Sequence, residues 1–331
     1  MHETLILTRA DVAAAMDLDA WLEAVETGFA AHARGDAWSP LPMHVEGEGG
    51  GFHAKGAALR LGRLYVAVKV NGNFPANPAE RGLPTIQGAI LLSDGSDGRL
   101  LAVMDSIEVT IRRTAAATAL AARYLARPDS ATVLVCGCGE QGRAQLEALR
   151  GVLPLTRALA YDLDQDSAGR FAAEIGDSFG LAVTPTKDLA EAARAADVIL
   201  ACTPSRTPYL GREMVAPGAF VAAVGADSSE KSELHPSLFE DTLVVADLVD
   251  QCAAIGDLRH AIAAGAIAPD GIHAELADLV AGRAAGRSSA EQIAVFDSTG
   301  TALQDVAAAA RIYVTCLALG SARSVALGSP D

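Results

Sequence analysis

From residue 131 onward, the chain alternates short apolar runs with amphipathic stretches. The apolar runs are ATVLVCG, RALAYD, ADVILACT, AFVAAVG, LVVAD and QIAVFD. Stretches such as EQGRAQLEALRGV lie between them and carry the spacing of amphipathic helices. Wholly apolar strands that alternate with helices are typical of a parallel sheet covered on both faces. The pattern therefore predicts an α/β domain in the second half of the chain.

The first hundred residues follow a different pattern. Thr8 and Asp11 have the spacing of a helix cap, and the amphipathic helix that follows ends at Gly35. Residues 40–104 alternate apolar runs (LYVAVKV, QGAILLSD, LLAVMD) with glycine-rich breaks, which predicts antiparallel strands and turns. Residues 106–126 and the late segment TALQDVAAAARIYVTCLALG have helical composition.

Composition and charge narrow the class of protein. The chain has 331 residues, of which 50% are hydrophobic, and this length predicts two domains. A net charge of −15 disfavours nucleic acid or an anionic membrane surface as the main partner, because both attract clustered Lys and Arg. A small anionic substrate is compatible with this charge, since a pocket can be locally positive. No secretory signal and no apolar run of ~18 residues is visible, and the five cysteines are dispersed, so we expect a cytoplasmic protein.

A glycine-rich loop follows the first apolar run of the α/β region. Gly137, Gly139 and Gly142 satisfy G-x-G-x-x-G between a predicted strand and a predicted helix, which is the context of a dinucleotide-binding loop. The helix N-terminus then offers N–H groups to a pyrophosphate. Asp162 ends the second strand, where a carboxylate accepts hydrogen bonds from a ribose 2′-OH and repels a 2′-phosphate. This favours NAD over NADP, with Asp164 as the alternative ribose ligand.

Two cysteines lie in the same loop. Cys136 ends the apolar strand and is expected to be buried, whereas Cys138 occupies a free position between two required glycines. A disulfide or a two-thiolate metal site here would block the phosphate-binding backbone. The nearby helix N-terminus predicts a lowered pKa for the Cys138 thiol and hence sensitivity to oxidation.

Two charged residues stand in apolar surroundings. Lys69 lies in the middle of LYVAVKV, and alternation puts it on the strand face opposite to Val68 and Val70. It is either an edge-strand lysine that points to water or a ligand for a carboxylate or imine. Asp227 follows the run AFVAAVG, where it is either a turn residue or a general acid/base beside a bound cofactor.

Six stretches together resemble the ornithine cyclodeaminase/mu-crystallin family. They are VAVKVNGNFPAN, GLPTIQGAILLSD, AVMDSIEVTIRRTAAATALAARYLA, VLVCGCGEQG, VGADSSEKSELHP and VFDSTGTALQD, in this order between about residues 64 and 305. The resemblance implies an α/β fold with a Rossmann-type NAD domain over residues 126–301. It also implies an α+β substrate-binding and dimerisation domain formed by residues 1–125 and 302–331, and a homodimer.

The resemblance also implies roles for individual residues. Lys69 matches the active-site lysine of the family, and Asp227 matches its catalytic aspartate, which a nearby Lys69 would keep ionised. Arg113 and Thr114, taken to begin the helix after the strands, match an Arg-Thr pair near the substrate carboxylate and nicotinamide, with Arg112 as the alternative. The predicted cofactor-binding residues are Gly137, Gly139, Glu140, Gln141, Gly142, Asp162, Thr203, Thr114, Ser298 and Gly300.

The chain departs from the family pattern at two substrate positions. Family cyclodeaminases carry an arginine after the first long helix, where this chain has His44 or Val45. They also carry a glutamate shortly before the strand lysine, near Gly56 here, with Lys55 beside it. The absent glutamate weakens ornithine as substrate, whereas Lys55 and His53 favour an acidic or neutral group. The predicted substrate-binding residues are Lys55, His44, Lys69 and Arg113; the histidines are not completed into a metal site.

These observations lead to three hypotheses for function. The first is an NAD(H)-dependent oxidoreductase that interconverts a small imino acid and an amino acid. The second is a cyclodeaminase that uses NAD+ catalytically and releases ammonia from a diamino acid. The third is a crystallin-like protein that binds nucleotide and a small ligand without turnover.

Overall fold

The structure is a computed structural model that describes residues 3–40, 42–320 and 322–327. The chain folds into two compact units. Unit 1 contains Met1–Arg113 and Thr301–Asp331, and unit 2 contains Thr114–Gly300. Helix α4 (Ser106–Leu125) continues across the division between the two units. The division follows Arg113, whereas the sequence-based boundary follows residue 125. Arg113 lies inside α4, so the prediction that Arg113 and Thr114 begin this helix is wrong.

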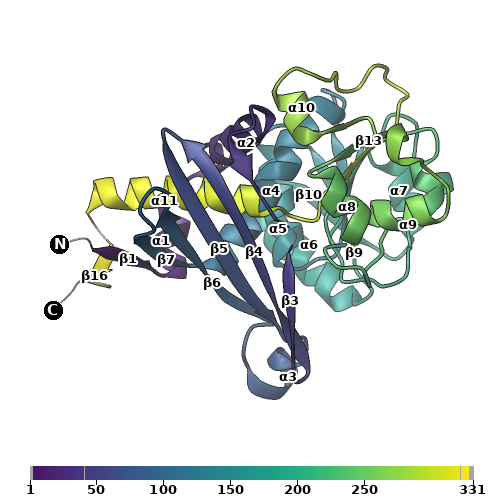
Figure 1. Cartoon of the computed structure of the whole chain (residues 1–331). Helices are drawn as coiled ribbons and strands as arrows, with labels where there is room; N and C mark the ends of the chain where they lie inside the picture. The colour runs from purple at the N-terminus through teal and green to yellow at the C-terminus, as the bar shows by residue number, and fades with distance from the viewer. Residues whose placement is uncertain (1–2, 41, 321, 328–331) are drawn as a thin grey trace. The chain divides into compact units, whose positions relative to one another are not determined.

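Unit 1 is built on an eight-stranded mixed sheet with the order β16-β1-β7-β6-β5-β4-β2, in which β3 also pairs with β4. The strands β3 to β7 form an antiparallel meander, whereas β1 runs parallel to β7 (Figure 1). The strands are β1 (Thr4–Leu7), β2 (Ala37–Trp38), β3 (Met43–Gly47), β4 (Gly50–Leu61), β5 (Arg63–Asn73), β6 (Ile86–Asp94), β7 (Leu100–Asp105) and β16 (Arg323–Val325).

Helices cover one face of this sheet. They are α1 (Arg9–Ala15), α2 (Leu18–Ala33) and α11 (Ala302–Leu319), with α2 and α11 packed on β4, whereas α3 (Asn77–Arg81) lies in the connection between β5 and β6. Thr8 and Asp11 form the predicted capping box of α1. At Gly28 of α2 a Cβ would lie 2.9 Å from the Cβ of Ala307, so the glycine allows close packing of α2 on α11. α11 has the length and apolar composition of a membrane span, yet most of it is buried in this core.

The other face of the sheet carries apolar side chains without a covering layer in the described residues. Val68 and Val70 of β5 are 40% and 41% exposed, because they point away from α11. Rows of small and apolar residues continue this face across neighbouring strands. They include Met43, Val45, Phe52, Ala54, Val68, Val70, Ala89 and Leu91.

Unit 2 contains an all-parallel eight-stranded sheet with the order β10-β9-β8-β11-β12-β15-β13-β14. The order reverses between β8 and β11, as it does in Rossmann-type sheets. The strands are β8 (Thr132–Cys136), β9 (Arg157–Tyr161), β10 (Ala182–Thr186), β11 (Val198–Ala201), β12 (Phe220–Ala223), β13 (Leu243–Ala246), β14 (Ala274–Glu275) and β15 (Ala294–Asp297). The helices are α5 (Glu140–Arg150), α6 (Gln165–Phe179), α7 (Leu189–Ala195), α8 (Val249–Ile255), α9 (Asp257–Ala263) and α10 (Leu276–Val280). The predicted α/β class is confirmed.

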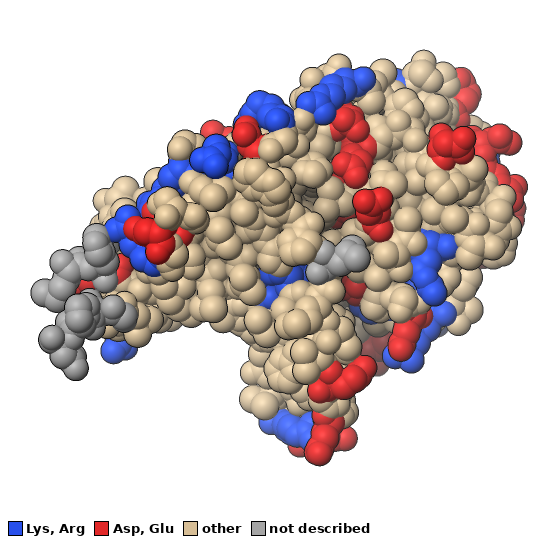
Figure 2. All heavy atoms as spheres, in the orientation of Figure 1, with Lys and Arg blue, Asp and Glu red and all other residues tan. Residues whose placement is uncertain are grey.

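The predicted parallel strands correspond to β8, β9, β11, β12, β13 and β15. Strand β10 is not recognisable from the sequence, since AVTPT contains Pro185 and lies at the sheet edge, where proline is tolerated. In unit 1, the long strand β4 was not singled out, because GGFHAKGAALRL is rich in glycine and alanine. On the face drawn in Figure 2, Lys and Arg form separate small groups among Asp and Glu rather than one basic stripe.

Candidate active site

A buried lysine is the starting point of the candidate site in unit 1. β5 lies between β4 and β6, so Lys69 is in an interior strand and the alternative of an edge-strand lysine is wrong. Alternation along β5 holds as predicted, with Tyr65, Ala67 and Lys69 on the face that α11 covers. Only 5% of the Lys69 side chain is exposed, so its ammonium requires a partner inside the protein.

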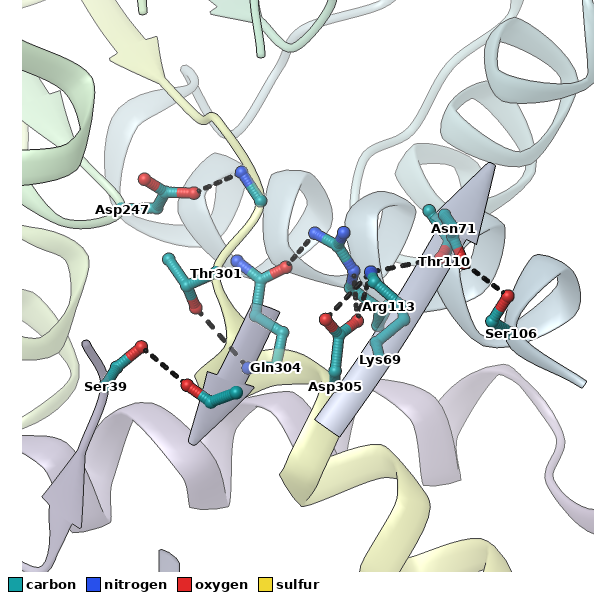
Figure 3. Close-up of polar contacts among 12 residues, drawn as sticks. Ser39, Lys69, Asn71, Ser106, Thr110, Arg113, Asp247, Thr301, Gln304 and Asp305 are labelled. Atoms are coloured by element: carbon teal, nitrogen blue, oxygen red, sulfur yellow. Dashed lines mark hydrogen bonds and ion pairs between the residues drawn. The ribbon is translucent and has the colours of Figure 1, made fainter. Parts of the chain in front are cut away.

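That partner is Asp305, in the first turn of α11. The Lys69 Nζ lies 2.9 Å from Asp305 Oδ1 and 2.8 Å from Oδ2, and it also donates to the Thr110 hydroxyl at 3.2 Å (Figure 3). Asp305 is buried as well, with 2% of its side chain exposed. The helix that carries Asp305 begins at the N-cap Thr301, whose hydroxyl accepts from the Gln304 N–H.

The same carboxylate binds a second cation. Arg113 Nε donates to Asp305 Oδ1 at 3.0 Å, and Arg113 Nη1 donates to Gln304 Oε1 at 2.7 Å (Figure 3). The Arg113 side chain is 4% exposed. Arg112 instead pairs with Glu108 at 2.9 Å, so Arg113 is the arginine that joins the lysine. Two cations from β5 and α4 therefore converge on one carboxylate of α11.

Lys55 lies on the same face of the sheet. In the β4–β5 register, Lys55 is directly opposite Lys69, whereas Gly56 is opposite Val68 and belongs to the uncovered face. Like charges at opposite positions repel each other. Burial lowers the pKa of Lys69 to about 7, and Arg113 and Lys55 add to this effect against the opposing influence of Asp305. Burial also acts on Asp305, but the two cations outweigh it and hold its pKa below the usual value.

The predicted histidines lie on β4 and on the neighbouring strand β3. His44 of β3 is opposite His53 of β4, and their Nδ1 atoms are 3.4 Å apart. His44 Nε2 also contacts Glu46 at 3.1 Å, and His44 is exposed. Among the residues that the structure describes, no group of three or more His, Cys, Asp or Glu is arranged to hold a metal ion.

In unit 2, the glycine loop connects β8 to α5. Gly137 has a φ of +97°, and a Cβ there would lie 2.6 Å from the carbonyl oxygen of Cys202. A Cβ on Gly142 would lie 2.3 Å from the carbonyl oxygen of Gly137. Gly139 is different, because it is the N-cap of α5 without a side-chain cap, and a Cβ there would meet nothing within 4 Å. Gly137 and Gly142 shape the loop, and Gly139 leaves space at the start of a helix that contains Glu140 and Gln141.

Asp162 lies directly after β9 and beside this loop. Its Oδ2 accepts a hydrogen bond from the Cys138 backbone N–H at 2.9 Å. Asp164 instead caps α6 by accepting from the Asp166 N–H, and it contacts Arg170. This arrangement favours Asp162 over Asp164 as the acidic residue next to the glycine loop.

The prediction of a reactive Cys138 thiol is wrong. Burial raises the pKa of Cys138 to about 12, and the neighbouring Asp162 carboxylate adds to this effect. Cys136 is fully buried, as predicted. Both cysteines are free thiols.

The other predicted cofactor residues follow the carboxyl ends of neighbouring strands. Thr203 follows β11, and both its N–H and its hydroxyl donate to the buried Glu233, at 2.6 and 2.7 Å. Ser298 and Gly300 follow β15, and both donate to Asp247, at 2.9 and 2.8 Å. Sequence reasoning identified these positions but missed Asp247, the carboxylate that shapes the last loop.

Asp227 and Thr114 complete the predicted set. Asp227 follows β12, is exposed, and accepts a hydrogen bond from Lys231 at 2.6 Å. Thr114 is buried inside α4, where its carbonyl oxygen accepts from Thr118. Lys69 donates to Asp305, and the sequence-based idea that Lys69 keeps Asp227 ionised stays a prediction.

A family comparison decides the relationship of this chain. The sequence model of the "Ornithine cyclodeaminase/mu-crystallin family" matches residues 2–318. This chain belongs to the ornithine cyclodeaminase/mu-crystallin family. The predicted family relationship is therefore confirmed over nearly the whole chain.

Two named relatives are similar to this chain along nearly their whole length. Alanine dehydrogenase of Archaeoglobus fulgidus is 37% identical over 315 residues, which are 95% of this chain and 96% of the relative. Iminosuccinate reductase of Paracoccus denitrificans is 32% identical over 326 residues, 97% of this chain and 99% of the relative.

Solved structures of the family have the same fold. An archaeal alanine dehydrogenase dimer with bound NAD superposes with a TM-score of 0.93 at 36% identity, covering 98% of this chain and 99% of that chain. Δ1-pyrroline-2-carboxylate reductase of Thermococcus litoralis, in complex with NADH and L-proline, gives 0.93 at 31% identity, covering 97% and 100%. A lysine cyclodeaminase structure gives 0.87 at 34% identity, covering 98% and 96%. The family thus includes both oxidoreductases and a cyclodeaminase.

Proposed function

We propose that this protein is an NAD(H)-dependent oxidoreductase that interconverts a small imino acid and the corresponding amino acid. The observation that carries the proposal is the cluster of Lys69, Arg113 and Lys55 around the single carboxylate of Asp305. An excess of positive charge at a buried site is suited to a small anionic substrate. The alanine dehydrogenase and imino-acid reductase relatives support this reaction class.

The residues of unit 2 fit NAD. Gly139 leaves open space at the N-terminus of α5, where free N–H groups and the helix dipole favour a pyrophosphate. Asp162 would accept the ribose hydroxyls and disfavour a 2′-phosphate. Thr203, Ser298 and Gly300 would line the remaining edge. When bound, NAD would accept or donate the hydride that changes the oxidation state of the substrate Cα.

The proposed roles of Arg113 and Lys69 follow from the hydrogen-bond donors that these side chains carry. The Arg113 guanidinium and the Lys69 ammonium would bind the substrate carboxylate by charge-assisted hydrogen bonds. With a pKa of about 7, Lys69 can also exchange a proton near neutral pH. Asp227 would carry the proton that the substrate nitrogen, or an attacking water, gains or loses. His44 and Lys55 would contact the far end of the substrate.

Lys55 is the reason for ranking the reductase above the cyclodeaminase. A cyclodeaminase substrate has a second amine, and the family glutamate expected near Gly56 would suit it. The β4–β5 register makes Lys55, not Gly56, the residue opposite Lys69, so a cation occupies the position that faces the substrate side. The similarity to a lysine cyclodeaminase nevertheless supports that reaction as the second candidate. Nucleotide and ligand binding without turnover is the third.

We further propose that the protein is a cytoplasmic homodimer. Val68, Val70 and their neighbours form an exposed apolar sheet face, and burial of such a face between two copies is favourable. A family structure is described as a dimer.

Substrate assays test the proposed reaction. We expect purified protein to oxidise NADH with pyruvate plus ammonia, iminosuccinate or a cyclic imino acid as substrate. Lys69→Ala and Asp227→Asn should each reduce kcat/KM at least ~100-fold, a loss typical of removed proton-transfer or charge-stabilising groups. Lys187→Ala is the matched control, because Lys187 is exposed on unit 2 and should leave turnover unchanged.

Other results of the same assays would support the cyclodeaminase or the binding protein instead. Release of ammonia and proline from ornithine without accumulation of NADH would contradict the reductase and support the cyclodeaminase. Tight binding of NADH with no turnover on the whole substrate panel would support the binding protein. Full activity of Lys69→Ala would refute the site itself.

A further inference from the structure

Two buried cations side by side are an unstable arrangement. Lys69 and Arg113 are 5% and 4% exposed, so water screens neither charge well. Among the described residues, every ion pair recorded for these two side chains is with Asp305. Lys55 adds further positive charge from the adjacent strand. The arrangement therefore depends on one carboxylate that the sequence patterns did not single out.

Some N–H donors of Lys69 and Arg113 are used in hydrogen bonds within the protein, and others are left for a ligand. Lys69 uses donors on Asp305 and Thr110, and an ammonium has three, so one remains. Arg113 uses Nε on Asp305 and one Nη1 hydrogen on Gln304. The second hydrogen of Nη1 and both hydrogens of Nη2 remain, and guanidinium N–H groups are donors that a carboxylate binds well.

Gln304 is oriented by the same contacts. Its Oε1 accepts from Arg113, and its Nε2 is buried without a hydrogen-bond partner within the described residues. A buried amide N–H without a partner is costly unless a ligand completes it. In the first turn of α11, Gln304 Oε1 therefore accepts from Arg113, and the Asp305 carboxylate binds both Lys69 and Arg113. The Gln304 Nε2 group is a donor that a ligand could complete.

We propose that Asp305 is the positioning residue of this site: its carboxylate holds Lys69 and Arg113 together, with their remaining donors available to the carboxylate-imine unit of the substrate, while Gln304 fixes the rotation of the guanidinium. The inference rests on the proposed function for the identity of the substrate. The contacts that carry it do not depend on the substrate.

The rigidity of α11 suits this role. Thr301 caps the helix, and Asp305 lies in its first turn, where the helix dipole favours an anion. The helix packs on α2, β4 and β5, and this packing fixes the backbone of Asp305 relative to the sheet. A carboxylate fixed in this way places two side chains from different elements, β5 and α4, without touching the substrate.

The titration midpoint of Lys69 is a measurable quantity that depends on Asp305. The groups that face it are Lys55 from β4, Arg113 and Thr110 from α4, and Asp305 from α11. Asp305 is the one anion in this described set. Its removal leaves burial and two repelling cations, all of which favour the neutral amine.

Lysine NMR tests the contact without any substrate. The chain contains four lysines, Lys55, Lys69, Lys187 and Lys231, so 13Cε/15Nζ signals can be assigned with single Lys→Arg variants. We expect Asp305→Asn to lower the titration midpoint of Lys69 by about 1 unit or more, the usual effect of losing a nearby opposite charge. Asp305→Glu should restore most of the shift. Asp94→Asn is the matched control, since Asp94 is a buried carboxylate of unit 1 that pairs with Arg63 and Arg99.

Kinetics then test the positioning. At pH 7, Asp305→Asn should lose at least ~10-fold in kcat/KM and regain part of it at lower pH, where Lys69 is protonated again. Gln304→Leu should raise KM for the substrate and leave the Lys69 midpoint unchanged, because it removes only the hydrogen bond from Arg113 Nη1. This second variant keeps the proposal testable if Asp305→Asn does not fold.

Two results would overturn the proposal. One is a Lys69 midpoint in folded Asp305→Asn equal to that of the wild type. The other is an unchanged KM in Gln304→Leu. If the Lys69 midpoint shifts as expected while no imino acid is reduced by the wild type, Asp305 holds Lys69 as inferred and the proposed reaction is the part that fails.

Discussion

At the scale of single residues, buried charges determine most of what is specific to this protein. Lys69 is identifiable from the sequence because a lysine in an apolar strand is unusual. Asp305 is not, because it is 236 residues away and no local spacing connects the two. Asp305 ends the family stretch VFDSTGTALQD, but acidic residues in the first turn of a helix also occur as simple helix caps, so this position gives no indication of its partners.

Unit 2 has a comparable buried carboxylate in Glu233. It accepts hydrogen bonds from Thr203, from Tyr209 and from the Gly225 N–H, and it is fully buried. Burial is the largest influence on it and, with the nearby Asp257, raises its pKa to about 7. Glu233 therefore links the predicted cofactor residue Thr203 to the loop after β12.

The raised pKa of Glu233 predicts a pH-dependent stability. A carboxyl group whose pKa is higher in the folded state contributes stability below its unfolded pKa, and this contribution is lost as pH rises through about 7. We expect the free energy of unfolding of unit 2 to fall by about 2–3 kcal/mol between pH 4.5 and 8 from this group. Glu233→Gln should reduce the slope, measured as thermal midpoints by circular dichroism.

Glu240→Gln is the control for this experiment. Glu240 is exposed, so its replacement should leave the pH dependence of the midpoint unchanged. Equal slopes for Glu233→Gln and the wild type would contradict the role assigned to Glu233.

At the scale of elements, the glycine loop is the best example of a local signal that predicts local structure. The strand, the loop and helix α5 form as expected from G-x-G-x-x-G, because Gly137 and Gly142 each avoid a clash with a nearby backbone oxygen and Gly139 leaves open space at the start of the helix. β4 is the contrary example, since its many glycines and alanines conceal a strand that pairs along its length with β5. Without β4, the position of Lys55 opposite Lys69 cannot be deduced.

Two glycine variants should separate loop shape from nucleotide binding. Gly142→Ala places a Cβ 2.3 Å from a backbone oxygen, so we expect a loss of about 2 kcal/mol or more in stability and weaker NADH binding. Gly139→Ala meets no atom within 4 Å, so it should leave stability nearly unchanged while weakening NADH binding at least ~10-fold. Fluorescence titration and thermal unfolding measure the two effects.

Gly169→Ala supplies the control. Gly169 lies inside α6 with open space around its Cβ position, and alanine is the better helix former. It should bind NADH as the wild type does. NADH binding unaffected by Gly139→Ala would contradict a pyrophosphate at this helix N-terminus.

At the scale of the whole molecule, unit 1 is formed by both ends of the chain, since residues 301–331 join residues 1–113 after unit 2. The strands and helices of residues 114–300 form unit 2, after which α11 completes the core of unit 1. This return of the chain to unit 1 brings Asp305 to Lys69. It also leaves the opposite face of the unit 1 sheet without a covering helix in the described residues.

The uncovered face leads to a prediction about assembly. Val68→Glu together with Val70→Glu places two charges on the apolar face, so we expect the proposed dimer to dissociate into monomers. Light scattering coupled to size exclusion measures the change. Leu163→Glu is the control, because Leu163 is 91% exposed on unit 2 and should not affect assembly. A dimer that survives the double substitution would place the interface elsewhere.

Features that arise from local spacing are predictable from the sequence alone. The sequence predicted the parallel strands of unit 2, the capped helix at Thr8, the glycine loop and the family relationship, because each depends on residues close together in the chain or on the motif order. The partners of the buried charges and the pKa of Cys138 depend instead on the folded arrangement. These depend on burial and on residues that are distant in sequence, and the apolar pattern of α11 gives no indication that its Asp305 joins β5 to α4.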